Sequence, residues 1–176
     1  MVDIKEWVIK HRWLAIILQL SIIIIIITGV RAWQLRDAMT GKAPDIQAVL
    51  LDGQAIKLAD YSGQPVLLYF WASWCPVCKI TSNSVNSIAQ DYKVITLASW
   101  SGKAEEVQQY MDEAGLTMPV IVDNQGEWAE RYGIKGVPAS FIIDAAGDIQ
   151  FIESGYTTEY GLRLRLWWLT KNLKKG

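Results

Sequence analysis

Two cysteines separated by two residues, Cys75 and Cys78, are the side chains of this sequence best suited to do chemistry. They follow a continuous apolar run, Val66 to Trp71, which predicts a buried strand. Pro76 predicts the first turn of a helix, because proline is favoured at the first helical position. Positions i and i+3 share one face of a helix, so the two sulfurs can close a small disulfide ring. A Cys-x-x-Cys pair at a strand-to-helix junction indicates redox chemistry.

The two cysteines are predicted to have different roles. Cys75 lies where the first amides of the helix carry partial positive charge, which stabilises a thiolate and makes this sulfur the attacking one. Cys78 lies one turn further along and is predicted to be more buried. It would be the resolving thiol, which attacks a mixed disulfide and releases the substrate. Pro76 and Val77 stand between them and are expected to tune the redox poise of the pair.

Other interpretations of the cysteine pair are weaker. A structural disulfide across a two-residue gap would close almost no loop and would constrain the unfolded chain little. Paired thiolates bind Cu(I) or zinc, but the chain has one histidine, His11, and no third cysteine. A peroxidase would need a lone cysteine in a Pro-x-x-x-Thr-x-x-Cys setting, which Ser73 and Trp74 do not supply. We therefore predict no metal ligands and no cofactor, and keep a Cu(I)-binding module as an alternative.

Length and charge place the pair in a tethered globular protein. The 176 residues are enough for one domain with a core and some further chain, and the formal net charge of −1 gives no support for a nucleic-acid partner. Residues 1–36 hold five Lys or Arg and two Asp or Glu, so the rest of the chain is acidic. A basic start and an acidic body fit a membrane-anchored domain.

The anchor is predicted at residues 13–30, which carry no charged side chain and include six consecutive isoleucines. As a helix they would extend about 27 Å, close to the thickness of the hydrocarbon core. The long apolar core and the sequence that follows it differ from a cleaved signal peptide. We expect residues 1–12 to be a cytoplasmic N-terminus, 31–43 a linker and 44–176 the globular domain. The basic residues flanking the span are balanced, so the orientation rests on the chemistry, which favours an oxidising compartment.

The sequence pattern of residues 44–176 predicts alternating strands and helices, with a hairpin before the first core strand and a second hairpin near the end. The expected strands are 46–51, 55–58, 66–71, 94–98, 119–122, one within 136–144, and 149–153. The expected helices are 76–90, 103–114, 127–132 and 158–174. Asp52-Gly53 and Ala146-Gly147-Asp148 are the predicted hairpin turns.

Two segments carry a resemblance to a known family. Trp71 to Lys79 (Trp-Ala-Ser-Trp-Cys-Pro-Val-Cys-Lys) and, some sixty residues on, Gly136 to Ala139 (Gly-Val-Pro-Ala) are similar to the thioredoxin superfamily, from Pro44 to the C-terminus. The resemblance implies an α/β thioredoxin fold: a mixed central sheet flanked by helices, here with an N-terminal β-hairpin extension and one N-terminal transmembrane helix. The anchor and hairpin resemble the membrane-tethered TlpA-like group of bacterial thiol–disulfide oxidoreductases. Within that group the Cys-Pro-Val-Cys pair is most similar to the suppressor-for-copper-sensitivity D type.

The resemblance also implies residue roles. It makes the bond between Val137 and Pro138 cis and places it beside the cysteines, where it exposes the Val137 backbone to a bound peptide and keeps metals off the thiols; the alternative is a trans proline that opens an edge strand. The expected substrate-docking residues are Trp74, Pro76, Val77, Val137 and Pro138. Tyr69 and Thr81 stand where relatives carry an aspartate and a glutamate, so no carboxylate is assigned as proton acceptor for Cys78.

The function implied is a membrane-tethered thiol–disulfide oxidoreductase of the bacterial inner membrane, with its catalytic domain in the periplasm. It would exchange disulfides with a protein partner, as a reductase supplied with electrons by a membrane reductant transporter. One alternative is a reductant for apocytochrome c thiols before haem attachment. The other, from a different class, is the Cu(I)-binding copper-tolerance module.

Overall fold

The computed structural model describes residues 4–173, and the side chains of residues 12–171 among them. The first three residues of the predicted N-terminal segment and Lys174 of the predicted last helix lie outside the described part. The strands are β1 (Gly41–Lys42), β2 (Gln47–Val49), β3 (Ala55–Lys57), β4 (Val66–Trp71), β5 (Lys93–Ser99), β6 (Val120–Asp123), β7 (Ala139–Ile143) and β8 (Asp148–Ser154). The helices are α1 (Ile4–Leu35), α2 (Pro76–Ile88), α3 (Ala104–Ala114), α4 (Glu127–Arg131) and α5 (Glu159–Leu173), with a 3-10 turn at Leu58–Tyr61.

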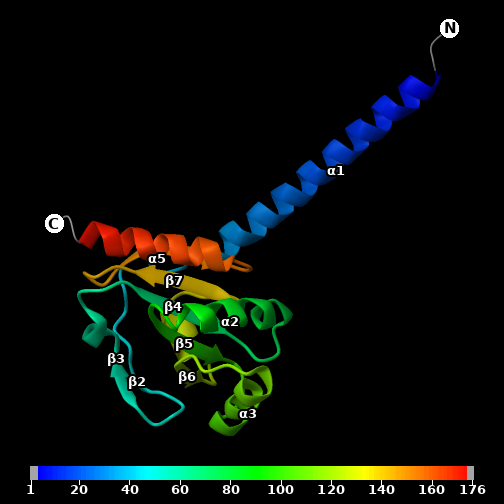
Figure 1. Cartoon of the computed structure of the whole chain (residues 1–176). Helices are drawn as coiled ribbons and strands as arrows, with labels where there is room; N and C mark the ends of the chain where they lie inside the picture. The colour runs from blue at the N-terminus through cyan, green and yellow to red at the C-terminus, as the bar shows by residue number, and fades with distance from the viewer. Residues whose placement is uncertain (1–3, 174–176) are drawn as a thin grey trace.

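A six-stranded mixed sheet in the order β1-β8-β7-β4-β5-β6 forms the centre of the domain (Figure 1). β4, β5 and β6 are parallel, whereas β7 runs antiparallel to β4 and β8 antiparallel to β7. This is the thioredoxin fold that the resemblance implies, and the predicted hairpin of β7 and β8 is confirmed.

β4 is the central strand, and all six of its residues are buried. Alternate side chains reach opposite faces of the sheet, as the pleat requires. Leu67 and Trp71 join a core with α2, α3 and α5, whereas Leu68 and Phe70 join a second core with α4 and the β2–β3 hairpin. An uninterrupted apolar run is therefore needed here, because neither face of the strand meets water.

The predicted N-terminal hairpin is present as β2 and β3, paired in antiparallel register. Gly53 adopts a φ of 88° in the turn, and the Asp52 carboxylate accepts a hydrogen bond of 2.9 Å from the backbone of Gln54. An isolated bridge from Leu50 to Ile121 connects the hairpin to β6. The hairpin thus packs against the second core and also contacts the edge of the sheet at β6.

The apolar N-terminal segment is one long helix, α1, which leaves the domain as a rod (Figure 1). Residues 12–35 are long and apolar enough to cross a membrane, and no part of that stretch is buried. The helix continues past Val30, so residues 31–35 of the expected linker are helical. The boundaries predicted for the cytoplasmic segment, the anchor, the linker and the domain stay predictions.

Residues 36–43 also differ from a free linker. Gly41 and Lys42 form β1 and pair with β8 at the edge of the sheet. Gly133 has a φ of 68°, and a Cβ at this position would overlap the backbone of Asp37. The chain that follows α1 is therefore held against the domain. A two-residue strand has too little pattern to be seen in the sequence, since its pairing is set by the partner strand.

Candidate functional site

Cys75 and Cys78 form a disulfide at the junction of β4 and α2. Their Cα atoms are 5.2 Å apart, within the range usual for a disulfide. Cys75 is the N-cap of α2, Pro76 is its first residue, and the backbone N–H of Cys78 donates to Cys75 Sγ over 3.2 Å. The first sulfur thus occupies the place where a helix end binds negative charge.

The two cysteines are both buried and differ slightly in access. Cys78 is fully buried, while Cys75 is 4% exposed. The greater burial of Cys78 agrees with the expectation from the sequence, and the attacking and resolving roles of the two thiols stay predictions.

A cis proline lies against the cysteine pair. The Val137–Pro138 bond is cis, as the resemblance implied, and Cys75 Sγ is 3.7 Å from the carbonyl oxygen of Val137. Val137 is half-buried and Pro138 is buried; the backbone N–H of Gly155 donates to the Pro138 carbonyl over 2.9 Å. The backbone of Val137 thus lies beside the Cys75 sulfur, where a substrate can reach it. Pro138 is buried and shapes this surface from underneath.

The other predicted docking residues are exposed next to Cys75. Trp74 is 62% exposed, and Pro76 and Val77 are also exposed. The structure adds Ile80, one turn further along α2, which is as exposed as Trp74. Its spacing from Pro76 and Val77 on a helix was the signal that could have found it.

Trp100 is a second residue of the site that the sequence did not indicate. It follows β5, and its carbonyl accepts a hydrogen bond of 2.9 Å from the Trp74 indole N–H. Its φ is 52°, in the left-handed region that bulky residues rarely adopt. β4 and β5 are parallel, so their carboxyl ends meet at the same sheet edge, and this topology could have indicated that residues after β5 approach the cysteines.

A chain of hydrogen bonds fixes the loop that follows β5 and carries Trp100. The Ser101 hydroxyl accepts from the backbone N–H of Ser73 (3.0 Å) and donates to the Ser99 carbonyl (3.1 Å). The Ser99 hydroxyl donates to the buried carboxylate of Asp123 over 2.7 Å. Asp123 also accepts from the first amides of α4, those of Trp128 and Ala129. These hydrogen bonds therefore connect the exposed surface beside Cys75 to Asp123, which is buried at the end of β6.

The side chains near Cys78 are hydroxyls rather than carboxylates. Tyr69 and Ser82 have their oxygens 3.5 Å apart, and Thr81 donates to the carbonyl of Val77 over 3.0 Å. Burial raises the pKa of Tyr69 well above its usual value near 10. Tyr69 therefore stays protonated near neutral pH and does not act as a base for Cys78.

Metal ligation has little support beyond the two thiols. Among the residues that the structure describes, no group of three or more His, Cys, Asp or Glu side chains could hold a metal ion. A copper ion would therefore have to bind through Cys75 and Cys78 themselves.

The fold and the site define a class: a thioredoxin-fold thiol–disulfide oxidoreductase, with a disulfide at a strand-to-helix junction and a cis proline against it. Comparison with known proteins agrees. Residues 39–152 match the AhpC/TSA family, so the chain belongs to this thioredoxin-like family. At the peroxidase motif positions the chain has Leu68 and Ala72 in place of proline and threonine, which does not favour a peroxidase.

Similar proteins indicate which kind of thiol–disulfide oxidoreductase this chain resembles. A thioredoxin-like protein of Haemophilus influenzae is 30% identical over 151 residues, covering 85% of this chain and 90% of its own. The thiol-disulfide oxidoreductase ResA of Geobacillus thermodenitrificans is 31% identical, covering 73% and 76% respectively. Among solved structures, a putative thiol:disulfide interchange protein DsbE from Chlorobium tepidum superposes with a TM-score of 0.67 at 27% identity, covering 76% of this chain and 99% of that one. The chain is thus a protein-disulfide oxidoreductase similar to ResA and DsbE.

Proposed function

We propose that this chain is a reductase of protein disulfides tethered to the bacterial inner membrane, with its domain in the periplasm. We place it in the TlpA-like group by its anchor and hairpin, and with the suppressor-for-copper-sensitivity D type by its Cys-Pro-Val-Cys pair. The observation that carries the proposal is the asymmetry of the disulfide: Cys75 caps α2 and faces the Val137 backbone, whereas Cys78 is fully buried.

The reaction starts from the reduced pair. The Cys75 thiolate attacks one sulfur of a substrate disulfide, forming a mixed disulfide, and the other substrate sulfur leaves as a thiolate. The departing substrate thiolate takes the proton of Cys78, whose sulfur then attacks Cys75. The second substrate sulfur leaves, two electrons have passed to the substrate, and the Cys75–Cys78 disulfide of the present structure is formed.

Substrate recognition would use the exposed surface around Cys75. The proposed docking residues Trp74, Pro76 and Val77 offer apolar surface next to the reacting sulfur, and the Val137 backbone can pair with an extended peptide. Pro138 shapes the floor of this region from its buried position. Recognition of an extended segment of a protein substrate would explain why the surface next to the cysteines is apolar and exposed.

Regeneration requires an electron donor for the Cys75–Cys78 disulfide. We propose a membrane reductant transporter, because α1 would hold the domain at the bilayer where such a donor resides. Labelling whole cells with a membrane-impermeant maleimide, after reduction, would modify Cys75 if the domain is periplasmic. Labelling only after cell lysis would contradict this orientation.

A trap for the mixed disulfide tests the reaction. The full chain carrying Cys78→Ser is expected to retain its protein partner covalently through Cys75, seen on a non-reducing gel. The matched control, Cys75→Ser with Cys78→Ser, should retain none. Capture of apocytochromes alone would move the function to cytochrome maturation. A reduction potential of about −270 mV fits a reductase, whereas one of about −120 mV would contradict the direction proposed.

A further inference from the structure

The last helix, α5, is apolar on two opposite faces. Its inner face buries three leucines, Leu162, Leu166 and Leu169, in the core shared with α2. Its outer face carries Tyr160, Leu164, Trp167 and Trp168, which are 87%, 64%, 45% and 48% exposed. These four positions recur at helical spacing, so they form one continuous stripe, which we call the outer stripe. Large apolar side chains gathered in this way on a surface helix mark an interaction site.

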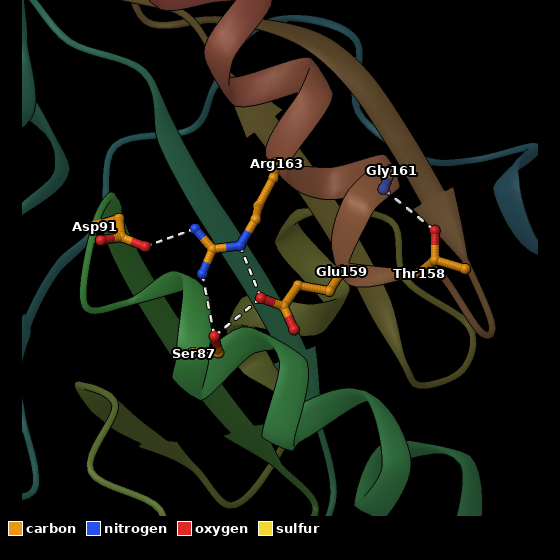
Figure 2. A network of polar contacts seen from close by, with 6 residues as sticks. All are labelled: Ser87, Asp91, Thr158, Glu159, Gly161 and Arg163. Carbon is orange, nitrogen blue, oxygen red and sulfur yellow. Dashed lines mark hydrogen bonds and ion pairs between the residues drawn. The ribbon is translucent and has the colours of Figure 1, made fainter.

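The orientation of α5 is fixed, so the outer stripe cannot turn inward. Figure 2 shows Arg163 extending from α5 to Ser87 on α2 and to Asp91, which follows α2. Its guanidinium also binds Glu159, one turn earlier on α5. The N-terminal end is capped by the Thr158 hydroxyl, which accepts from the backbone N–H of Gly161 over 3.2 Å. The exposed stripe is therefore a permanent feature of the domain.

The outer stripe begins where the anchor meets the domain. The Arg31 guanidinium donates to the Tyr156 carbonyl over 3.3 Å, three residues before α5 starts. Ser154, at the end of β8, donates to the side chain of Gln34 over 2.8 Å. Figure 1 shows α5 lying along the side of the domain from which α1 departs. The start of α5 is thus held close to the end of the predicted span, where hydrocarbon gives way to lipid headgroups.

The chemistry of the stripe matches that boundary. Tryptophan and tyrosine are enriched at membrane–water interfaces, where their rings meet apolar chains and their polar atoms meet water. The ammonium of Lys171 lies 4.4 Å from the ring centroid of Trp167, so a cation stands at the rim of the stripe. Lysine at such a rim keeps its charge in the headgroup layer and attracts anionic lipid.

We propose that the outer stripe of α5 lies in the headgroup region of the same bilayer that α1 spans. This inference rests on the proposed anchoring: α1 brings the stripe to the membrane, and the stripe then fixes the tilt of the domain. The occupant is a lipid surface rather than a protein, because the contact of Arg31 with Tyr156 places the stripe beside the anchor exit. The domain is then held by two elements, one through the bilayer and one along its surface.

Site-directed spin labelling of the full chain in nanodiscs of phosphatidylethanolamine and phosphatidylglycerol tests this. In a background with both native cysteines replaced by serine, single labels are placed at Leu164→Cys on the stripe and Val49→Cys on β2. These sites are matched in exposure, 64% and 59%, and β2 lies on the far side of the domain from α5 (Figure 1). A third label at Ile24→Cys reports on the anchor. Circular dichroism of each labelled variant confirms folding.

Collision with oxygen, which concentrates in lipid, is compared with collision with a water-soluble nickel chelate. We expect the ratio of oxygen collisions to nickel-chelate collisions to be higher at Leu164→Cys than at Val49→Cys, and closer to the ratio at Ile24→Cys. The ratio at Val49→Cys should be the low one of a site exposed to water. If Ile24→Cys lies in lipid but Leu164→Cys matches Val49→Cys, the surface contact is refuted and the anchor stands. If Ile24→Cys is itself aqueous, the anchoring proposed above fails and this inference falls with it.

Discussion

Gly126 offers a sharp test of how the loop beside the cysteines is held. Its φ is 73°, and a Cβ at this position would overlap the indole of Trp100. Gly115, which ends α3, has a similar φ of 63°, and a Cβ there meets nothing within 4 Å among the described residues. Alanine at either glycine therefore meets the same backbone penalty, but only Gly126→Ala also displaces Trp100.

The two substitutions should separate by the cost of moving the indole. A left-handed alanine costs about 1 to 2 kcal/mol, so Gly115→Ala is expected to lower the free energy of unfolding by that amount. Overpacking adds about 1 to 3 kcal/mol, which brings Gly126→Ala to about 2 to 5 kcal/mol. Urea unfolding of the oxidised full chain in detergent, followed by tryptophan fluorescence, measures both losses. The slope against urea should stay unchanged.

The displacement should also reach the reaction. Trp100 holds Trp74 through its carbonyl, so moving Trp100 is expected to slow exchange with a protein disulfide more than exchange with a small-molecule disulfide. Gly115→Ala should leave both rates near those of the parent. Equal losses of stability in the two variants would refute the packing argument. An unchanged ratio of the two exchange rates in Gly126→Ala would refute the link to Trp74.

Three further outcomes are expected. Asp123→Asn should lower the free energy of unfolding by about 2 to 3 kcal/mol, because a buried carboxylate that accepts a hydroxyl and two amides is lost; exposed Asp112→Asn should stay within about 0.5 kcal/mol in the same urea assay, and equal effects would contradict this. Hydrogen bonding to Arg163 lowers the pKa of Glu159, so its stabilising contribution is present above the ordinary value of 4.5 and is lost as pH falls below it. Glu159→Gln should accordingly lose less stability than the parent on acidification, and a parallel loss would argue against it. Trp74→Phe removes the indole N–H that donates to the Trp100 carbonyl, together with part of the exposed ring surface, so KM for a protein disulfide should rise with kcat little changed; a fall in kcat alone would point to a role in the chemistry instead.

The elements around the cysteines could be predicted from the sequence because their signals are local. β4 matches its predicted bounds, since a strand covered on both faces must be apolar throughout. α2 begins at Pro76 as expected, and Gly115 ends α3. The cis bond before Pro138 was available only through the resemblance, because a Val-Pro pair is compatible with either isomer.

The features that were missed depend on residues far apart in the chain. β1 is two residues long and exists because β8 offers it a free edge. Trp100 takes a left-handed conformation that no propensity favours for tryptophan, and its place at the site follows from β5 lying beside β4. The outer stripe of α5 hides in the sequence because apolar residues on two faces remove the one-sided pattern that marks a surface helix.

The tight passage of Asp37 past Gly133 limits how far the domain can move relative to α1. A long flexible tether would let the domain sweep a volume whose radius grows with the square root of tether length. Here the segment that follows α1 is held against the domain, through this approach and through the edge strand β1. With α1 in a bilayer, the cysteines would stay within a thin layer above the lipid, so encounters become nearly two-dimensional and favour proteins that share the same membrane.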